Sequence, residues 1–312
     1  MNIKSIQLQP IFTINEEILI GEIVAFNTTP EKSILVATAL KPLDYTIVQE
    51  GWATLPKSTP EGAQSYCVYE IKHGKICKDI KIVGEKYNIH DVQLFPNDDI
   101  LMVCSRTPHT PSEDFGGNGR IYSPDGILKS DILLGDAIES TQITSKGTIW
   151  TGLFDEGTFD ESGLKEWSKD GNKLYEFEQV KGLDYIWDCY ALNVASNNAT
   201  YCYYYSQFPL VQIQDNKIIN YWKIPIKGSH AFAIFEDYAL FTGGYKCDNF
   251  FLIKLLESHK VEILQELELL DEDNEPLKFS RVANRGSSIF GLYGKKIYEL
   301  DLHQLISTQM MA

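Results

Sequence analysis

The chain has 312 residues, of which 44% are hydrophobic and 12% aromatic, so it can bury a full core and is too apolar for a disordered protein. Its 43 acidic side chains outnumber its 28 basic ones and give a net charge of −15. Such a surface repels a phosphate backbone, and we therefore expect no nucleic acid partner.

The first twenty residues carry Glu16 and Glu17 where a signal peptide would need an unbroken apolar stretch. No later segment approaches about 20 consecutive apolar residues, the length that a membrane helix requires. We therefore expect a soluble, cytoplasmic protein with no membrane partner. The six cysteines include no CxxC pair, so we expect reduced, buried thiols rather than disulfides or metal ligands.

Short apolar runs separated by turn residues recur along the whole chain. A first hairpin turn occurs six times, at residues 30–32, 96–98, 145–147, 196–198, 236–237 and 284–286. A second hairpin turn follows five of them, at residues 73–74, 125–126, 170–171, 215–216 and 258–259. A period of about 40 to 50 residues with two hairpins in each unit predicts an all-β fold, a β-propeller with six blades.

Three stretches need separate interpretation. Residues 40–64 lengthen the first unit and are rich in Pro, Gly, Thr and Ser, which indicates an insertion. Pro225 is placed in the outermost strand of blade four, where an edge tolerates proline. The apolar residues of 250–270 also fit a helical spacing, but two strands are favoured because a helix would delete the second hairpin of that blade.

The sixth unit stops after Leu300 with three strands of its own. We expect the segment from Ile3 to Ile14 to supply the fourth strand beside Ile297, so that the N-terminal strand completes the last blade and closes the ring. The prediction is a single domain over residues 1–306 with a short polar tail at 307–312.

Two motifs, residues 147–150 (Gly-Thr-Ile-Trp) and 168–172 (Ser-Lys-Asp-Gly-Asn), are the kind of strand and turn that propeller repeats share. With the spacing above, the chain resembles the six-bladed β-propeller proteins of bacteria across nearly its whole length. It lacks the Gly-His and Trp-Asp pairing of WD repeats, and it carries Gly243-Gly244 without the double glycine in every blade that Kelch repeats need. The resemblance therefore implies a fold and no particular function.

In a propeller, the loops before the innermost strands and the loops between second and third strands surround the mouth of the central channel. Polar residues at the starts of the inner strands are therefore expected to form a ring there: Glu22, His90 with Asp91, Glu139, Asp188, His230 and Arg281. The loops between second and third strands add further candidate binding residues: Arg106, His109, Asp155, Glu156 and Tyr205. Such a ring suits Ca²⁺ or another divalent cation. The alternative is that these residues merely cap loops around a hydrated channel.

Two functions stay open. The first is a binding module that recognises a protein partner or a small ligand on this face, for example an antitoxin, an immunity factor or an adaptor that meets a basic partner. The second is a metal-dependent hydrolase or lactonase with a cation at the channel mouth. The sequence contains no GxSxG, HExxH, P-loop or GxGxxG motif, so binding is favoured and enzyme activity is undecided.

Overall fold

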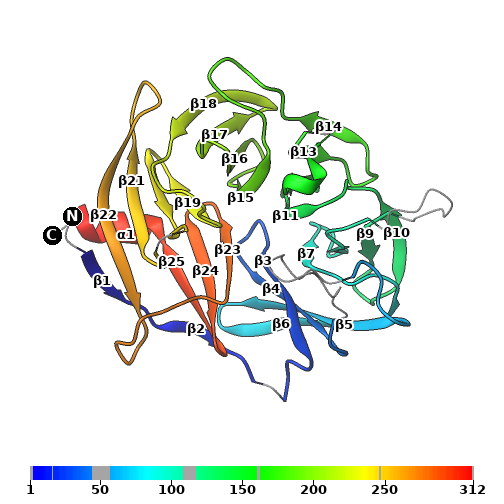
Figure 1. Ribbon diagram of the computed structural model, residues 1–312. Coiled ribbons are helices and arrows are strands. Elements are labelled where there is room, and N and C mark those ends of the chain that lie inside the picture. The colour runs from blue at the N-terminus through cyan, green and yellow to red at the C-terminus, as the bar shows by residue number, and fades with distance from the viewer. Residues whose placement is uncertain are drawn as a thin grey trace, which may run out of the picture.

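The computed structural model describes residues 3–15, 17–43, 57–107, 117–159, 162–245 and 247–310. Its strands form six sheets arranged in a ring around a central axis, so the chain is a six-bladed β-propeller (Figure 1). The predicted fold class and blade count are confirmed. No helix in the described part of the chain has the length and apolar character needed to cross a bilayer.

Each blade contains four antiparallel strands, and in blades one to five these follow one another in chain order from the channel outward. Blade one contains β3 (Glu22–Thr28), β4 (Ile34–Ala39), β5 (Gln64–Lys72) and β6 (Lys75–Glu85). Blade two contains β7 (Asp91–Leu94), β8 (Ile100–Val103), β9 (Gly119–Tyr122) and β10 (Leu128–Ile132). Blade three contains β11 (Ile138–Ile143), β12 (Ile149–Leu153), β13 (Leu164–Trp167) and β14 (Lys173–Glu176), with a 3-10 turn η1 (Asp155–Gly157) between its second and third strands.

The second half of the ring repeats this order. Blade four contains β15 (Asp188–Val194), β16 (Ala199–Tyr205), β17 (Pro209–Gln214) and β18 (Lys217–Lys223). Blade five contains β19 (Phe232–Phe235), β20 (Tyr238–Phe241), β21 (Phe250–Leu255) and β22 (Val261–Leu270). Blade six contains β23 (Arg281–Arg285), β24 (Ser288–Tyr293) and β25 (Lys296–Asp301), and β2 (Pro10–Thr13) is its outermost strand.

The predicted turns lie at the ends of these hairpins. Asp215 and Asn216, for example, have positive φ values of 47° and 59°. A two-residue hairpin turn needs such values because its backbone twist must match the twist of the two strands that it joins. Residues 250–270 form two strands, so the helical alternative for that segment is wrong. Pro225 follows β18, which ends at Lys223, so its placement inside the outermost strand is corrected.

The chain ends differ in part from the expectation. β2 pairs antiparallel with β25, with Phe12 opposite Ile297, and this confirms closure of the ring by the N-terminal segment. That segment is not one strand, because β1 (Ile3–Gln7) leaves blade six and pairs in parallel with β22 as a fifth strand of blade five (Figure 1).

At the other end, the chain forms α1 (Leu302–Met310) where a polar tail was expected after residue 306. The Asp301 side chain accepts the backbone N–H of Gln304 at 3.0 Å, an N-cap contact, while Leu302 and Ile306 are buried against the propeller.

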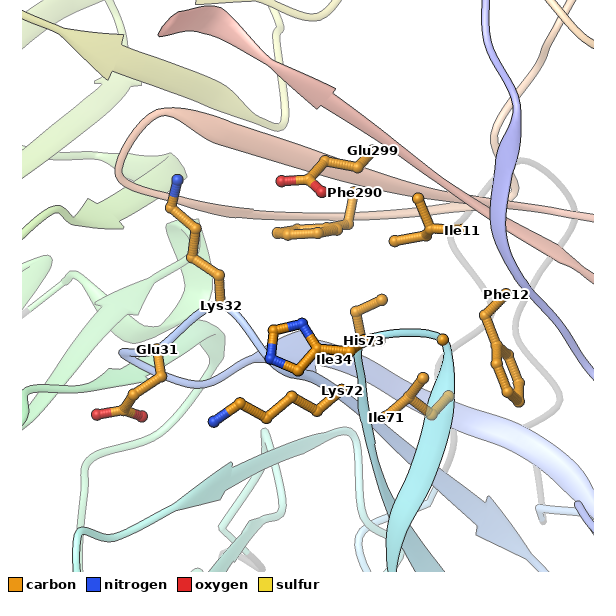
Figure 2. A pocket seen from close by; sticks show the side chains of 11 residues that line it. Ile11, Phe12, Glu31, Lys32, Ile34, Ile71, Lys72, His73, Phe290 and Glu299 are labelled. Atoms are coloured by element: carbon orange, nitrogen blue, oxygen red, sulfur yellow. The ribbon is translucent and has the colours of Figure 1, made fainter. Parts of the chain in front are cut away.

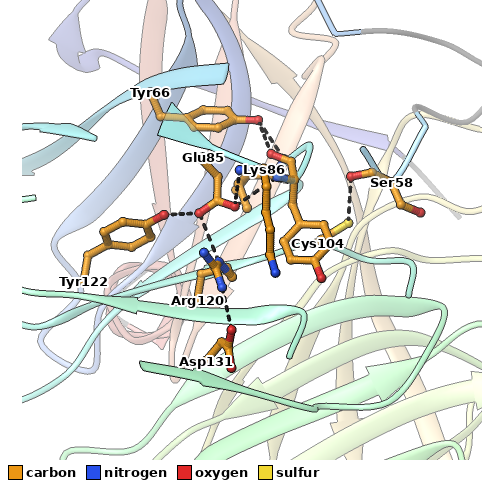
Figure 3. A network of polar contacts seen from close by, with 10 residues as sticks. Ser58, Tyr66, Glu85, Lys86, Cys104, Arg120, Tyr122 and Asp131 are labelled. Carbon is orange, nitrogen blue, oxygen red and sulfur yellow. Dashed lines mark hydrogen bonds and ion pairs between the residues drawn. The ribbon is translucent and has the colours of Figure 1, made fainter. Parts of the chain in front are cut away.

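Apolar clusters fill the spaces between neighbouring blades, and one buried charged network lies among them. Glu85 is fully buried between blades one and two (Figure 3). Its carboxylate accepts the N–H groups of Lys86 and Tyr87 at 2.7 and 2.9 Å and a hydrogen bond from the Tyr122 hydroxyl, and it pairs with the Arg120 guanidinium at 3.2 Å. Because every lone pair has a donor, this network serves to join two blades.

The predicted reduced state of the cysteines agrees with the structure, in which all six are free. Four of them are buried, as expected, whereas Cys77 is exposed and Cys247 is partly exposed.

Candidate functional site

The central channel is closed at one end by amide side chains. Five of the six inner strands carry an Asn or Gln at their penultimate position: Asn27, Gln93, Gln142, Asn193 and Asn284. These amides, which we call the amide plug, are all buried and hydrogen-bonded to other blades.

Gln142 shows how the plug spans the channel. Its side-chain N–H groups bind the carbonyls of Leu192 in blade four, at 3.1 Å, and Asn284 in blade six, at 3.0 Å. Its side-chain oxygen accepts the N–H of Val194 at 2.8 Å and a guanidinium N–H of Arg285 at 3.2 Å. One side chain therefore joins three blades.

Above the plug lies a cavity of about 310 Å³, which we call the cup. Residues from all six blades line it, and Asn27, Gln142 and Asn284 of the plug form its closed end. Its volume is at the lower end of the range of about 300 to 1,000 Å³ that is usual for small-molecule sites. Five members of the predicted ring line the cup together: His90, Asp91, Glu139, His230 and Arg281.

His90 is held as a neutral ring. Its Nδ1 accepts the backbone N–H of Ser105 at 3.1 Å, so the ring proton is assigned to Nε2. Burial, together with the positive charge of Arg281, lowers the pKa of His90 to about 4. At neutral pH the ring is therefore an uncharged hydrogen-bond donor.

Asp91 lies beside His90 at the start of β7. Its carboxylate accepts the Asn27 amide at 2.6 Å and the backbone N–H of Thr141 at 2.9 Å. Burial nevertheless raises the pKa of Asp91 to about 7. Its hydrogen bonds connect blades one, two and three at the wall of the cup.

Three carboxylates of blades three and four act electrostatically on one another, and Glu139 lines the cup whereas Asp188 and Asp155 lie outside its wall. Burial raises the pKa of Glu139, although water reaches its side chain from the cup. Burial also raises the pKa of Asp188 to about 7, and the negative charges of Glu139 and Asp155 add to this increase. No hydrogen bond or ion pair joins either the Glu139 or the Asp188 carboxylate to another side chain of the described residues, so this acidic side has no internal counter-ion there.

Arg281 begins β23 in blade six, three blades away from Glu139 in a ring of six. Its guanidinium donates an N–H to the carbonyl of Ile23 at 2.9 Å and lines the cup. The positive charge of Arg281 and the negative charge of Glu139 therefore lie on opposite sides of one cavity.

An aromatic group forms a third side of the cup. The Tyr190 ring stacks on the His230 ring with 5.1 Å between centroids and an interplanar angle of 26°. The hydroxyls of Tyr190 and Tyr245 hydrogen-bond to each other, and Phe208 packs edge-on against Tyr190. Burial lowers the pKa of His230, so this wall is uncharged at neutral pH. Tyr205, a predicted binding residue, contacts Phe208 at the outer margin of the group.

The remaining predicted residues do not line the cup. Glu22 is exposed at the start of β3 and lies outside the cup wall. Arg106 and Glu156 form an ion pair with each other, and Arg106 also lies 3.5 Å from Asp136, so these loops hold blades two and three together. His109 lies outside the described residues.

Sequence reasoning missed Tyr190 and the amide plug. Tyr190 lies within a strand rather than at its start, which is where the candidates were sought. The repeated amide at the penultimate position of the inner strands was a readable signal for the plug, because five strands share it.

Two of the larger cavities lie away from the channel. A pocket of about 450 Å³ opens between blades six and one, where His73 projects between Phe290 and Lys72 (Figure 2). Lys32 on its margin is already bound to Asp301, at 3.3 Å. A groove of about 1,120 Å³ runs beside blade three, and large exposed apolar side chains border it: Leu133, Phe159, Tyr185 and Trp187.

The sequence predicts a divalent cation at the mouth of this channel. In the described ranges, no group of three or more His, Cys, Asp or Glu side chains is arranged to hold a metal ion. The binding of Ca²⁺ or another divalent cation thus stays a prediction without geometric support.

Comparison with known proteins adds little about function. The model of the YxzG family matches residues 172–300, less than half of the chain. Similar solved structures include a chain of a mitotic checkpoint complex, with 8% identity, 95% of this chain and 93% of that chain covered and a TM-score of 0.48. They also include a streptogramin B lyase, with 11% identity, coverages of 92% and 95% and a TM-score of 0.47. A protein of unknown function from Bacteroides caccae has 13% identity, coverages of 64% and 81% and a TM-score of 0.37. A search of curated proteins finds no match.

Proposed function

We propose that the protein is a binding module that takes a small polar molecule into the cup. The observation that carries this proposal is a channel closed by the amide plug beneath a cavity with charged walls. A closed end gives a ligand a floor to rest on, and side chains from six blades can contact it at once.

The electrostatics of the cup support the same function. Burying a carboxylate beside other carboxylates is unfavourable unless a partner compensates the charge. Asp188 is half-buried beside the negative charge of Glu139, which lines the cup and is open to its water. A ligand that donates hydrogen bonds or carries positive charge would reduce the repulsion between them. A rigid propeller keeps these groups in place before the ligand arrives, which reduces the entropic cost of binding.

A panel of defined probes tests the proposal. The twenty standard amino acids, primary amines, short carboxylates and monosaccharides would each be added to the purified protein, and binding would be measured by ligand-observed NMR and thermal shift. We expect at least one class to bind the wild type and to lose at least about tenfold in affinity in the double variant Glu139→Gln, Arg281→Gln.

The matched control is Glu257→Gln with Lys260→Gln, which removes the same charges from exposed positions near the second turn of blade five. It should bind like the wild type. The proposal fails if no probe binds, or if the cup variant binds every probe as well as the control does.

A hydrolase is a second candidate, and one observation favours it. Burial and the negative charge of a second carboxylate, Glu139, raise the pKa of Asp188 to about 7, so this group can donate or accept a proton at neutral pH. Hydrolysis of nitrophenyl ester and lactone probes, followed from pH 5 to 9, tests it. We expect a rate that changes near pH 7 and is lost in Asp188→Asn, and equal background rates for the two proteins would exclude it.

A further inference from the structure

We propose that the groove beside blade three is a second binding site, which takes an extended peptide segment of a partner protein. The segment carries apolar side chains that fill the groove and a basic residue at its margin. We call this site the blade-three groove. It shares no lining residue with the cup, so the inference goes beyond the proposed function and does not depend on it.

The size of the groove suits a peptide better than a small molecule. Its volume is about 1,120 Å³, against about 310 Å³ for the cup. The usual range for small-molecule sites is about 300 to 1,000 Å³. The groove extends along the outer part of blade three, from Gly171 in the second hairpin turn to Trp187 just before β15.

The deepest lining of the groove is apolar and fixed by the fold. Trp167, Phe177 and Ile186 line it and are almost wholly buried. The Trp167 indole N–H donates to the Thr151 hydroxyl at 2.9 Å, and Phe177 packs edge-on against Tyr204 with 5.7 Å between ring centroids. Because this surface is already in place, a partner can bury side chains against it without reorganising the groove.

The rim of the groove exposes large apolar and aromatic side chains. Leu133, Tyr185 and Trp187 are 59%, 60% and 43% exposed. Within the described ranges, no hydrogen bond reaches the Tyr185 hydroxyl or the Trp187 indole N–H. The Trp187 backbone is held, because its N–H donates to the Tyr205 carbonyl at 3.2 Å and its carbonyl accepts the Thr158 hydroxyl at 3.1 Å. Exposed Tyr and Trp side chains around a groove are typical of protein interfaces, where the ring becomes covered and its polar atom finds a partner.

The free edge of the blade favours an extended conformation of the partner. β14 is the outermost strand of blade three and pairs only with β13 among the described strands. Two of its residues, Lys173 and Glu176, line the groove. A segment of about four to six residues can lie along this four-residue strand and pair with its backbone, while alternate side chains enter the groove.

The charge at the margin of the groove favours a basic partner. Lys173 and Glu176 neutralise each other at 2.6 Å, and the nearly buried Lys165 lies over the Trp167 ring. Glu178 is exposed on the margin and forms no ion pair with any described residue. The net charge of −15 attracts an approaching Lys or Arg side chain over a long distance, and Glu178 can then pair with it.

A library of random heptapeptides displayed on phage, selected on the immobilised full-length protein, tests this inference. Enriched sequences would be synthesised, and their affinities would be measured by fluorescence anisotropy. We expect them to combine at least two large apolar residues with a Lys or Arg. The double variant Tyr185→Ser, Trp187→Ser should bind them at least about tenfold more weakly than the wild type does.

A second variant tests the charge. Glu178→Gln should weaken binding about twofold to fivefold, and added salt should reduce this difference, because an exposed ion pair is screened. An affinity of Glu178→Gln equal to that of the wild type at low salt would overturn the assignment of a basic residue to this margin.

The matched control is Val83→Ser with Ile219→Ser, which removes two exposed apolar side chains from the outermost strands of blades one and four. It should bind the peptides like the wild type. Melting curves establish that each variant is folded, and the single variant Leu133→Ser on the same rim replaces the double variant if that one does not melt cooperatively.

Three results would overturn the inference: no peptide is enriched, the enriched peptides are acidic or lack apolar residues, or they bind the groove variant as well as the control. None of these results bears on the cup, because its ligands are tested with small probes and with variants of other residues.

Discussion

Replacing Gln142 by alanine would test whether the amide plug holds the ring together. The Gln142 side chain is 4% exposed, and its amide makes four hydrogen bonds to blades four and six. The variant removes all four hydrogen bonds, one of which joins residues 142 positions apart. The change in stability therefore reports on contacts between blades rather than on the strand that contains Gln142.

The size of the effect follows from the groups left without partners. The Leu192 carbonyl keeps a bond from Asn284, at 2.9 Å, but the N–H of Val194, the Asn284 carbonyl and one N–H of Arg285 lose theirs. A buried polar group left unpaired costs about 1 to 3 kcal/mol, and water entering from the cup offsets part of this cost. We expect a loss of about 3 to 5 kcal/mol in the free energy of unfolding.

For a chain of this length, that loss lowers the melting temperature by about 5 to 8 °C. Circular dichroism melting of the wild type and Gln142→Ala measures it, and Gln179→Ala, an exposed glutamine outside the plug, is the matched control. A decrease no larger than that of the control would refute the role assigned to the plug.

Three further predictions concern stability. Folding raises the pKa of Asp188 from 3.8 to about 7, so the folded state binds the proton more tightly than the unfolded state. The wild type should therefore lose stability relative to Asp188→Asn as the pH rises from 4 to 7. Melting temperatures of the two proteins that change in parallel with pH would contradict this. Arg120→Ala leaves the buried Glu85 carboxylate without its cationic partner and should lower the free energy of unfolding, measured by chemical denaturation, by about 3 to 5 kcal/mol. A decrease below about 1 kcal/mol would argue against a stabilising role for this ion pair. Deleting residues 1–8 removes the largely exposed β1 and should lower the melting temperature by only a few degrees. Deleting residues 1–14 also removes β2 and opens blade six, so it should abolish the cooperative unfolding transition. Similar melting of the two deletion variants would show that β2 does not close the ring.

The candidate site was predictable in part. Polar residues at the starts of inner strands meet at one channel mouth in any propeller, and five of the seven predicted ring members line the cup together. Arg106 and Glu156 also lie on that face, but the sequence did not indicate that they neutralise each other. Pairing of this kind depends on distances between blades, which no local pattern encodes.

The N-terminal strand shows the same limit at the level of the fold. Alternation in residues 3–14 indicated strand structure and the need to close blade six, and β2 does so. The parallel pairing of β1 with β22 depends on an open edge elsewhere in the ring, at a register of Ile3 opposite Glu266. A pairing between segments this far apart leaves no signal in either of them.

The amino-acid sequence by itself determined the blade count and hairpin positions, because turn residues with positive φ and the apolar runs beside them act over a few residues. Only the tertiary structure decided that amides from five strands plug the channel and that Glu139 faces Arg281 across the cup. The contacts of the plug between blades join residues 39 to 143 positions apart, and their geometry exists only once the ring has closed.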